Sequence, residues 1–158
     1  MRILDLTLPT PAENLACEEV LLHGAEAGES GEILRFWESP EYFAVVGYAN
    51  KVASEVNIAA CEARGIPILR RCSGGGTVVQ GPGCLNYAVI LQITADGPTR
   101  SISTANQFIM ERTRAAIASL APRPSPLALA IRGHTDLALG NFKFSGNACS
   151  TINSPGDH

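Results

Sequence analysis

The sequence predicts an α/β (α+β) domain, in which a mixed, largely antiparallel β-sheet is flanked by α-helices. Three observations point to this class. Short runs with apolar alternation recur, as in residues 2–8; two longer stretches carry helix signals; and residues 135–148 have the pattern of a hairpin. Hydrophobic residues make up 46% of the 158 positions, which is enough for a sizeable core, so one domain is expected over residues 1–149, with an irregular tail at 150–158.

The elements follow from local start and stop signals. Thr10-Pro11-Ala12-Glu13 is a capping box with proline at the first helical position, and Gly65 stops a later helix. Ser103 or Thr104 is the expected cap of the last helix. The predicted order is strand 2–8, helix to Ala27, strands 33–37 and 42–46 paired around the turn 38–41, helix 52–63, strand 66–70, strand 85–93, helix to Leu120, extended connector 121–126 and the hairpin.

The most distinctive segment is RRCSGGGTVVQGPGCLNY, which begins at Arg70 and places two arginines before three consecutive glycines. Residues without Cβ let the backbone approach a ligand closely, and arginine binds phosphate or carboxylate by paired hydrogen bonds. The segment matches neither G-x-x-x-x-G-K-[ST] nor a G-x-G-x-x-G that opens a helix. A glycine-rich turn between strands is the alternative; the arginine pair, Thr77 and Asn86 favour a cradle for an anionic nucleotide ligand.

The second informative segment is TDLALGNFKFSGNA, in which two alternating runs surround Gly140-Asn141, a two-residue hairpin loop. The expected cross-strand pairs are Leu139 with Phe142, Ala138 with Lys143, Leu137 with Phe144, and Asp136 with Ser145. Period two then places the large apolar residues on one face, and Lys143 with Asp136 on the other. Lys143 is either half of a surface ion pair with Asp136 or a functional cation.

These two blocks together resemble the signature of lipoate-protein ligases and of their biotin-ligase and octanoyltransferase relatives. The second block is similar to the later motif of that group, Lys-x-Ser-Gly-x-Ala, and the likeness spans about Arg35 to Ala148. It is most similar to the lipoate-protein ligase A family. The resemblance implies the biotin/lipoate-ligase-like catalytic fold, which is related to that of class II aminoacyl-tRNA synthetases.

The activity that the resemblance implies is ATP-dependent activation of lipoate to lipoyl-AMP, followed by transfer to a lysine of a lipoyl-accepting protein. The implied cofactors are ATP, lipoate and the Mg²⁺ that accompanies ATP. The implied acceptors are 2-oxoacid dehydrogenase E2 subunits and the glycine cleavage H protein. Three alternatives stay open: octanoyl transfer from acyl carrier protein, biotin as the acyl group, and a non-catalytic binder of lipoate or an adenylate.

The resemblance also assigns site residues. Lys143 is the catalytic candidate, with an electrostatic role rather than that of a covalent nucleophile. The candidate ligand-binding positions are Arg71, Ser73, Gly74, Gly75, Gly76, Thr77, Val78, Asn86, Asp136 and Ala148. Of these, Arg71 and Asp136 are included for the chemistry of their side chains, and the others match motif positions of the family. No metal-binding residue is expected.

Two departures from the family pattern stand out. Gln80 occupies a position where many members have histidine, and glutamine forms hydrogen bonds but does not titrate near neutral pH. Members of the family usually continue well past the lysine motif, whereas this sequence stops ten residues after Ala148. A truncated chain that binds weakly, pairs with another chain or lacks turnover is the hypothesis that follows.

Composition excludes several other classes. The net charge of −3 gives no electrostatic reason to expect nucleic-acid binding, and no apolar run is long enough to span a membrane. The early charges after Met1 argue against a signal peptide, so a cytoplasmic protein is expected. Five cysteines without C-x-x-C and three histidines without ligand spacing predict reduced thiols and no metal site. Cys149 is a minor catalytic candidate because it directly follows Ala148.

Overall fold

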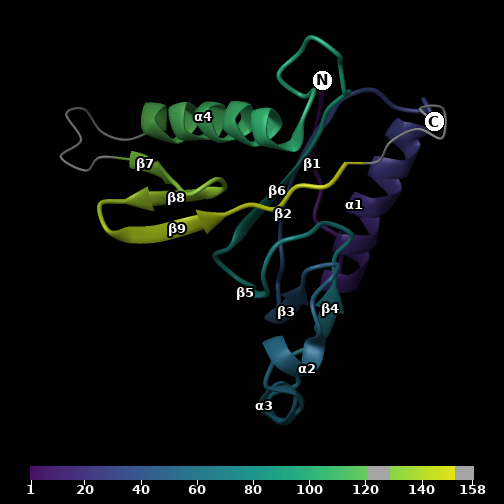
Figure 1. Ribbon diagram of the computed structural model, residues 1–158. Helices are drawn as coiled ribbons and strands as arrows, with labels where there is room; N and C mark the ends of the chain where they lie inside the picture. The colour runs from purple at the N-terminus through teal and green to yellow at the C-terminus, as the bar shows by residue number, and fades with distance from the viewer. Residues whose placement is uncertain (121–128, 152–158) are drawn as a thin grey trace. The chain divides into compact units, whose positions relative to one another are not determined.

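The computed structural model describes residues 1–120 and 129–151, which form two compact units (Figure 1). Unit 1 is Met1–Gln92 and unit 2 is Ile93–Thr151. Helices accompany strands in both, and antiparallel pairs outnumber parallel ones, which confirms the predicted mixed, largely antiparallel α/β class. The single catalytic domain over residues 1–149 stays a prediction. The connector 121–126 and most of the tail lie outside the described residues.

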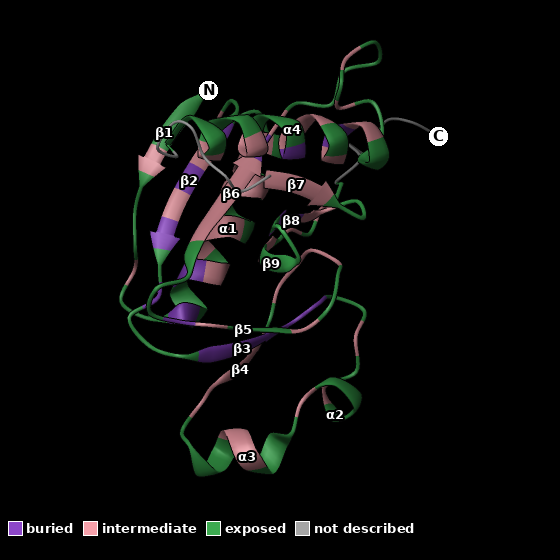
Figure 2. Cartoon of the chain, turned by 90° about the vertical axis from the view of Figure 1, so that its left-hand side faces the viewer, coloured by how far each residue is buried: buried purple, intermediate pink, exposed green. Residues whose placement is uncertain are grey.

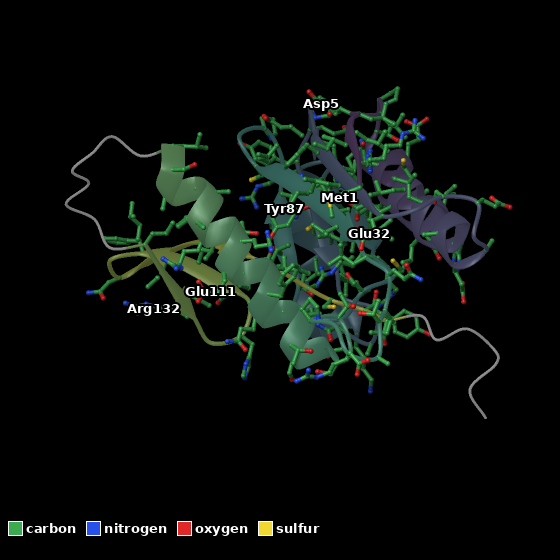
Figure 3. The ribbon with its side chains drawn as sticks, turned by 90° about the horizontal axis from the view of Figure 1, so that it is seen from above. Met1, Asp5, Glu32, Tyr87, Glu111 and Arg132 are labelled. Atoms are coloured by element: carbon green, nitrogen blue, oxygen red, sulfur yellow. The ribbon has the colours of Figure 1, made fainter. Side chains whose placement is uncertain are left out.

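Unit 1 contains two three-stranded sheets, with strand orders β1-β2-β6 and β4-β3-β5. In each sheet the central strand pairs with one parallel and one antiparallel neighbour. Figure 3 labels Asp5 at the end of β1 and Tyr87 on β6, the two outer strands of the first sheet. The elements are β1 Arg2–Asp5, α1 Pro11–Glu26, β2 Ile33–Glu38, β3 Phe43–Val46, α2 Val52–Glu55, α3 Ile58–Ala63, β4 Ile68–Arg70, β5 Val78–Gln80 and β6 Leu85–Ile90.

Helix α1 begins as the sequence predicts. The Thr10 hydroxyl accepts a hydrogen bond from the Glu13 N–H at 3.2 Å, and the Glu13 carboxylate accepts one from the Thr10 N–H at 2.9 Å. One turn later Asn14 is fully buried, and its amide both donates to the Leu8 carbonyl and accepts from the Leu8 N–H. These bonds satisfy otherwise unpaired backbone groups and fasten the helix to the strand before it.

The core of unit 1 lies on the inner faces of β2 and β3. All four residues of β3 are buried, whereas β2 alternates between buried and half-buried positions (Figure 2). Trp37 stacks on Phe43 with ring centroids 6.2 Å apart, and Val45 completes a cluster against which Leu15 of α1 and Leu69 of β4 pack. The cluster joins both sheets and the helix through buried apolar area, the main favourable term in folding.

The two strands predicted to pair around residues 38–41 do not pair, so that part of the prediction is wrong. Strand β2 has β1 on one side and β6 on the other, while β3 belongs to the second sheet. The reason lies in the connection. Pro40 restricts Ser39 to extended backbone and donates no hydrogen bond, and the Ser39 hydroxyl instead donates to the Glu41 carbonyl at 2.6 Å. The chain therefore crosses to another sheet instead of turning back.

The single helix predicted over residues 52–63 is two short helices, α2 and α3, so its continuity was wrong. Val56 between them is extended, at φ −130° and ψ 134°. The Asn57 side chain accepts a hydrogen bond from the Ala60 N–H at 3.1 Å and starts the second helix as its N-cap. Asparagine competes with the helical backbone in this way and favours caps over helix interiors. Gly65 ends α3 at φ +62°, as predicted.

Unit 2 consists of helix α4, Ile102–Leu120, and the sheet β7-β8-β9, with α4 packed on β7 and β8. Its strands are β7 Leu129–Arg132, β8 Asp136–Leu139 and β9 Phe142–Gly146. Figure 3 labels Glu111 on α4 and Arg132 at the end of β7. The helix starts slightly earlier than predicted, because the Ser101 hydroxyl, not that of Ser103 or Thr104, accepts the Thr104 N–H at 3.2 Å.

The hairpin β8–β9 has the predicted loop but only half of the predicted register. Leu139 pairs with Phe142 and Ala138 with Lys143, as expected, whereas Leu137 pairs with Ser145 and Asp136 with Gly146. A β-bulge at Phe144 shifts the remainder of β9 by one residue. The predicted apolar face is therefore wrong as well: Leu137 and Ala138 are buried, while Phe142 and Phe144 are 81% and 50% exposed.

Candidate functional site

The glycine segment forms a loop, Ser73–Thr77, between β4 and β5, which flank the buried strand β3 in one sheet. The backbone N–H of Arg71 donates to the Val46 carbonyl at 3.1 Å, so the chain enters the loop directly from the sheet. Gly75 has φ +86°, a conformation that residues with a Cβ rarely adopt. We call residues Ser73–Thr77 the glycine loop.

The guanidinium of Arg71 holds the glycine loop by its carbonyl oxygens. Nη2 donates to the Gly74 oxygen at 2.6 Å and to the Gly76 oxygen at 2.7 Å, and Nε donates to the Gly74 oxygen at 3.2 Å. Burial lowers the pKa of Arg71 from its ordinary value, although a guanidinium stays charged. The sequence predicts that Arg71 binds the ligand; in the structure these donors shape the loop, and direct contact with a ligand stays a prediction.

The loop amides contrast with the loop carbonyls. No hydrogen bond from the N–H groups of Gly74, Gly75, Gly76 or Thr77 is found within residues 1–120 and 129–151. A trans peptide points its C=O and the next N–H in opposite directions, so tying the carbonyls to Arg71 turns the following amides away from it. The Thr77 hydroxyl is also buried and has no partner among the described residues. Unpaired donors at one loop are the arrangement that binds anions.

Beside Arg71 lies a group of residues that the sequence did not single out. Glu18 of α1 accepts a hydrogen bond from the Trp37 indole N–H at 2.6 Å. Burial raises the pKa of Glu18, opposed by that hydrogen bond and by the charges of Arg35 and Arg71. A hollow of about 200 Å³ opens next to this group. It is lined by Ala12, Leu15, Ala16, Glu19, Leu69, Arg70, Arg71 and Cys72.

Substituting Glu18 by glutamine is expected to stabilise the protein at neutral pH. Because burial raises the folded-state pKa of Glu18 above its unfolded value, stability falls as pH rises from about 4.3 through the folded pKa. Glutamine keeps an oxygen acceptor for Trp37 and has no charge to bury. Urea unfolding between pH 4 and pH 8 should show a gain at pH 7 that disappears at pH 4. A gain of equal size at both values, or the same profile in Glu19→Gln at the exposed neighbour, would contradict this account.

The remaining predicted positions of unit 1 lie on β5 and β6. Asn86 of β6 is half-buried opposite Trp37, and its amide donates to the Cys84 carbonyl at 3.1 Å. Val78 opens β5 with its side chain exposed. Gln80, at the position where the family pattern has histidine, ends β5 opposite Phe43. Val78 and Gln80 therefore lie before the Gly81-Pro82-Gly83 turn, and Asn86 lies after it.

In unit 2 the predicted lysine and aspartate form an ion pair. Lys143 Nζ lies 2.9 Å from Asp136 Oδ2, with the lysine side chain 59% exposed. The bulge makes this possible by placing Gly146 opposite Asp136. A Cβ on Gly146 would lie 3.2 Å from Lys143 Nζ, so the absence of that Cβ leaves room for the lysine side chain. Ala148, two residues on, is exposed.

Cys149 does not have the environment of an activated nucleophile. Burial raises the pKa of its thiol, and the same holds for Cys72 beside the glycine loop, whose pKa neighbouring carboxylates raise further. A nucleophilic cysteine needs the opposite shift, because the thiolate is the reactive form. All five cysteines are free thiols.

Metal-binding clusters and membrane-spanning helices are both absent from the described residues. No group of three or more His, Cys, Asp or Glu side chains is arranged to hold a metal ion in residues 1–120 and 129–151. In the same ranges no helix is long and apolar enough to cross a membrane.

Comparison with known proteins decides the family. A family model described as the lipoyl protein ligase A/B catalytic domain matches residues 10–154. The chain belongs to this family. Among curated relatives, lipoate–protein ligase 1 of Staphylococcus aureus is 33% identical over 146 residues, covering 92% of this chain and 40% of the relative. Octanoyltransferase LipM of Exiguobacterium sibiricum is 31% identical over 113 residues, covering 72% and 41%.

Solved structures of the lipoyl protein ligase family have the same fold. A lipoate-protein ligase A bound with ATP superposes with a TM-score of 0.77 at 27% identity, covering 96% of this chain and 61% of that one. A Thermoplasma acidophilum protein with bound lipoic acid gives 0.77 at 26% identity, covering 96% and 63%. A bipartite lipoate protein ligase of the same organism gives 0.79 at 23% identity, covering 96% and 56%. The chain spans about half the length of the relatives it matches.

Proposed function

We propose that this protein acts in lipoate–protein ligation, in which lipoate and ATP form lipoyl-AMP and the lipoyl group passes to a lysine of an acceptor protein. Membership of the lipoyl protein ligase family supports the reaction class. The observation that carries the proposal is the glycine loop: its carbonyls are tied down, and the N–H groups of Gly74, Gly75, Gly76 and Thr77 have no acceptor in the described part of the chain.

The first half-reaction requires hydrogen-bond donors around a phosphate. A lipoate carboxylate oxygen attacks the α-phosphorus of ATP, the bond to the β-phosphate oxygen breaks, and pyrophosphate leaves. Backbone amides that need no reorganisation stabilise the charge that develops on the phosphate oxygens. We assign this role to the glycine loop, with the Thr77 hydroxyl as a further donor and with Ser73, Val78 and Asn86 as surrounding ligand contacts. The hollow beside Arg71, whose lining includes Leu15 and Leu69, is proposed to take the acyl part.

The second half-reaction requires a cation to stabilise the departing phosphate. The acceptor amine attacks the acyl carbonyl of the adenylate, a proton leaves the amine, and AMP departs with the electron pair of the broken C–O bond. Lys143 is suited to stabilise the departing phosphate, because Asp136 holds its ammonium group in place at 2.9 Å. Its role is electrostatic, and no covalent intermediate on the lysine is required. Ala148, exposed and small, is proposed to line the ligand beside this group.

The proposed ligands and partners are based on those of similar proteins. ATP and lipoic acid occur in solved structures of similar proteins, and Mg²⁺ would enter with the phosphates of ATP. The Thermoplasma structure belongs to a lipoylation system described as a bipartite lipoate protein ligase and its E2 lipoyl domain, which supports lipoyl domains as acceptors. We propose 2-oxoacid dehydrogenase E2 subunits and the glycine cleavage H protein as the acceptors, and the cytoplasm as the location.

Octanoyl transfer from acyl carrier protein is the second candidate, and the likeness to octanoyltransferase LipM favours it. A cysteine that carried the acyl group would react as its thiolate, and burial raises the pKa of the Cys149 thiol, which argues against Cys149 in that role. Octanoyl transfer needs no ATP, so ATP-dependent release of pyrophosphate separates the two activities. A non-catalytic binder would bind the adenylate and release nothing.

The first experiment is calorimetric titration of lipoyl-adenylate, or a stable analogue, into the whole chain. Tight binding, with AMP and lipoate each binding more weakly, would support the proposed function. Absence of binding to the folded chain would overturn it. Pyrophosphate release with lipoate and ATP, measured with and without a lipoyl domain, then separates a ligase from a binder that lacks turnover.

A further inference from the structure

A second loop, Gly47-Tyr48-Ala49-Asn50, lies against the glycine loop and is itself held in shape. It follows strand β3, and the Arg70 guanidinium closes it: Nη1 donates to the carbonyl oxygens of Gly47, Tyr48 and Asn50 at 2.8, 2.8 and 2.9 Å. The Asn50 N–H also donates to the Gly47 carbonyl at 3.1 Å. We call these four residues the 47–50 loop. Arg70 is thus committed to backbone carbonyls, as Arg71 is.

The 47–50 loop donates hydrogen bonds to two carbonyl oxygens of the glycine loop. The Tyr48 N–H donates to the Ser73 oxygen at 3.0 Å, and the Asn50 side-chain amide donates to the Gly75 oxygen at 3.1 Å. Gly47 permits the approach, because a Cβ there would collide with the Gly75 oxygen. No described side chain other than that of Asn50 donates to the Gly75 oxygen within residues 1–120 and 129–151.

These two contacts complete the pattern that Arg71 begins. Arg71 holds the oxygens of Gly74 and Gly76, while the 47–50 loop holds those of Ser73 and Gly75. Every carbonyl of four consecutive peptides is therefore held by a protein donor. Since each trans peptide opposes its C=O and the following N–H, all four following amides are turned away from the donors that hold the carbonyls.

We propose that Asn50 is a positioning residue for the anion cradle: by holding the Gly75 oxygen, its amide fixes the direction of the Gly76 N–H. The inference rests on the proposed function for the identity of the ligand, and adds a residue that does not itself touch it. The positive φ of Gly75 makes the assignment specific. Glycine populates many backbone conformations, so without the Asn50 donor the Gly75–Gly76 peptide is free to rotate and to turn its carbonyl toward the anion.

Two substitutions and a matched control test the proposal by titration with lipoyl-adenylate or its stable analogue. Asn50→Ala removes the donor and should weaken binding about tenfold, the effect of one neutral hydrogen bond. Asn50→Asp keeps the shape but turns a donor into an acceptor beside the Gly75 oxygen, and should weaken binding more. Asn57→Ala is the control, because Asn57 uses its side chain only to cap α3. It should lower stability and leave the affinity unchanged.

A second measurement reads the loop without any ligand. In ¹H–¹⁵N spectra of the uniformly labelled chain, Asn50→Ala should shift the amide signals of Gly75 and Gly76 and lower their heteronuclear NOE, whereas Asn57→Ala should not. Unchanged glycine signals, or wild-type affinity in Asn50→Ala, would overturn the role of Asn50. Absence of adenylate binding by wild type, with the expected spectral changes in Asn50→Ala, would overturn the proposed function and leave the role of Asn50 in loop order standing.

Discussion

Lys143→Ala is expected to weaken binding of lipoyl-adenylate by about 10- to 100-fold while leaving the melting temperature nearly unchanged. A hydrogen bond to a charged group contributes about 1.5–3 kcal/mol, and about 1.4 kcal/mol corresponds to a tenfold change in affinity. The ion pair with Asp136 contributes little to folding, because the lysine side chain is 59% exposed and exposed pairs are worth about 0–1 kcal/mol. Calorimetry for affinity and a thermal melt for stability check both parts.

The chain supplies its own control for this experiment. Lys51 is the only other lysine in the sequence, and it precedes α2 without a side-chain hydrogen bond to the helix. Lys51→Ala should leave the affinity within about twofold of wild type. Asp136→Asn should weaken binding less than Lys143→Ala, because the cation remains but loses the partner that orients it. Equal losses in the two lysine variants would mean that only the overall positive charge matters, and would refute a specific role for Lys143.

Elements that carry their own local signal were predicted from the sequence. The Thr10–Glu13 capping box, the stop at Gly65 and the Gly140-Asn141 loop each depend on a few adjacent residues, and each occurs in the structure. Strand partners depend on residues far apart in the chain. The separation of β2 from β3 follows from the Ser39-Pro40 connection and from the partners that β2 has in β1 and β6, and apolar alternation encodes neither this pairing nor the bulge at Phe144.

The candidate site divides in the same way. The glycine loop and the Lys143–Asp136 pair were found because their residues lie within short motifs, and their chemical roles stay predictions. The roles of Arg71 and Asn50 in holding loop carbonyls, and the half-buried Glu18, were missed. Asn50 and Gly75 are 25 residues apart, and a side chain that bonds to distant backbone leaves no periodic pattern. The available signal was Gly47, a glycine directly after the apolar run of β3.

The second large effect is expected in the core of unit 1, where Arg35 is fully buried on the inner face of β2. Its guanidinium donates to the Leu6 carbonyl at 3.1 Å, to the Asn14 carbonyl at 2.9 Å and to the Asn14 side-chain oxygen at 2.6 Å, and it lies 5.5 Å from the Trp37 ring centre. The charge therefore ties β2 to the start of α1 through hydrogen bonds alone, with no carboxylate among these partners.

Arg35→Met is expected to lower the free energy of unfolding by about 3 kcal/mol or more. Methionine keeps much of the apolar volume of the side chain, so the fall in unfolding free energy reports the loss of the guanidinium hydrogen bonds. Each buried acceptor left without a partner costs about 1–3 kcal/mol. The urea concentration at the midpoint of unfolding should fall. The slope of the unfolding free energy against urea concentration should stay the same, because the surface area exposed on unfolding is unchanged. Arg114→Met is the matched control, because Arg114 pairs with Glu111 on the surface of α4 and should change stability by less than about 1 kcal/mol.

A loss of under about 1 kcal/mol in Arg35→Met would show that water replaces the guanidinium at these carbonyls. The strand and helix would then be joined by the apolar cluster of Trp37 and Phe43, and the buried cation would have to be explained by its charge beside Glu18.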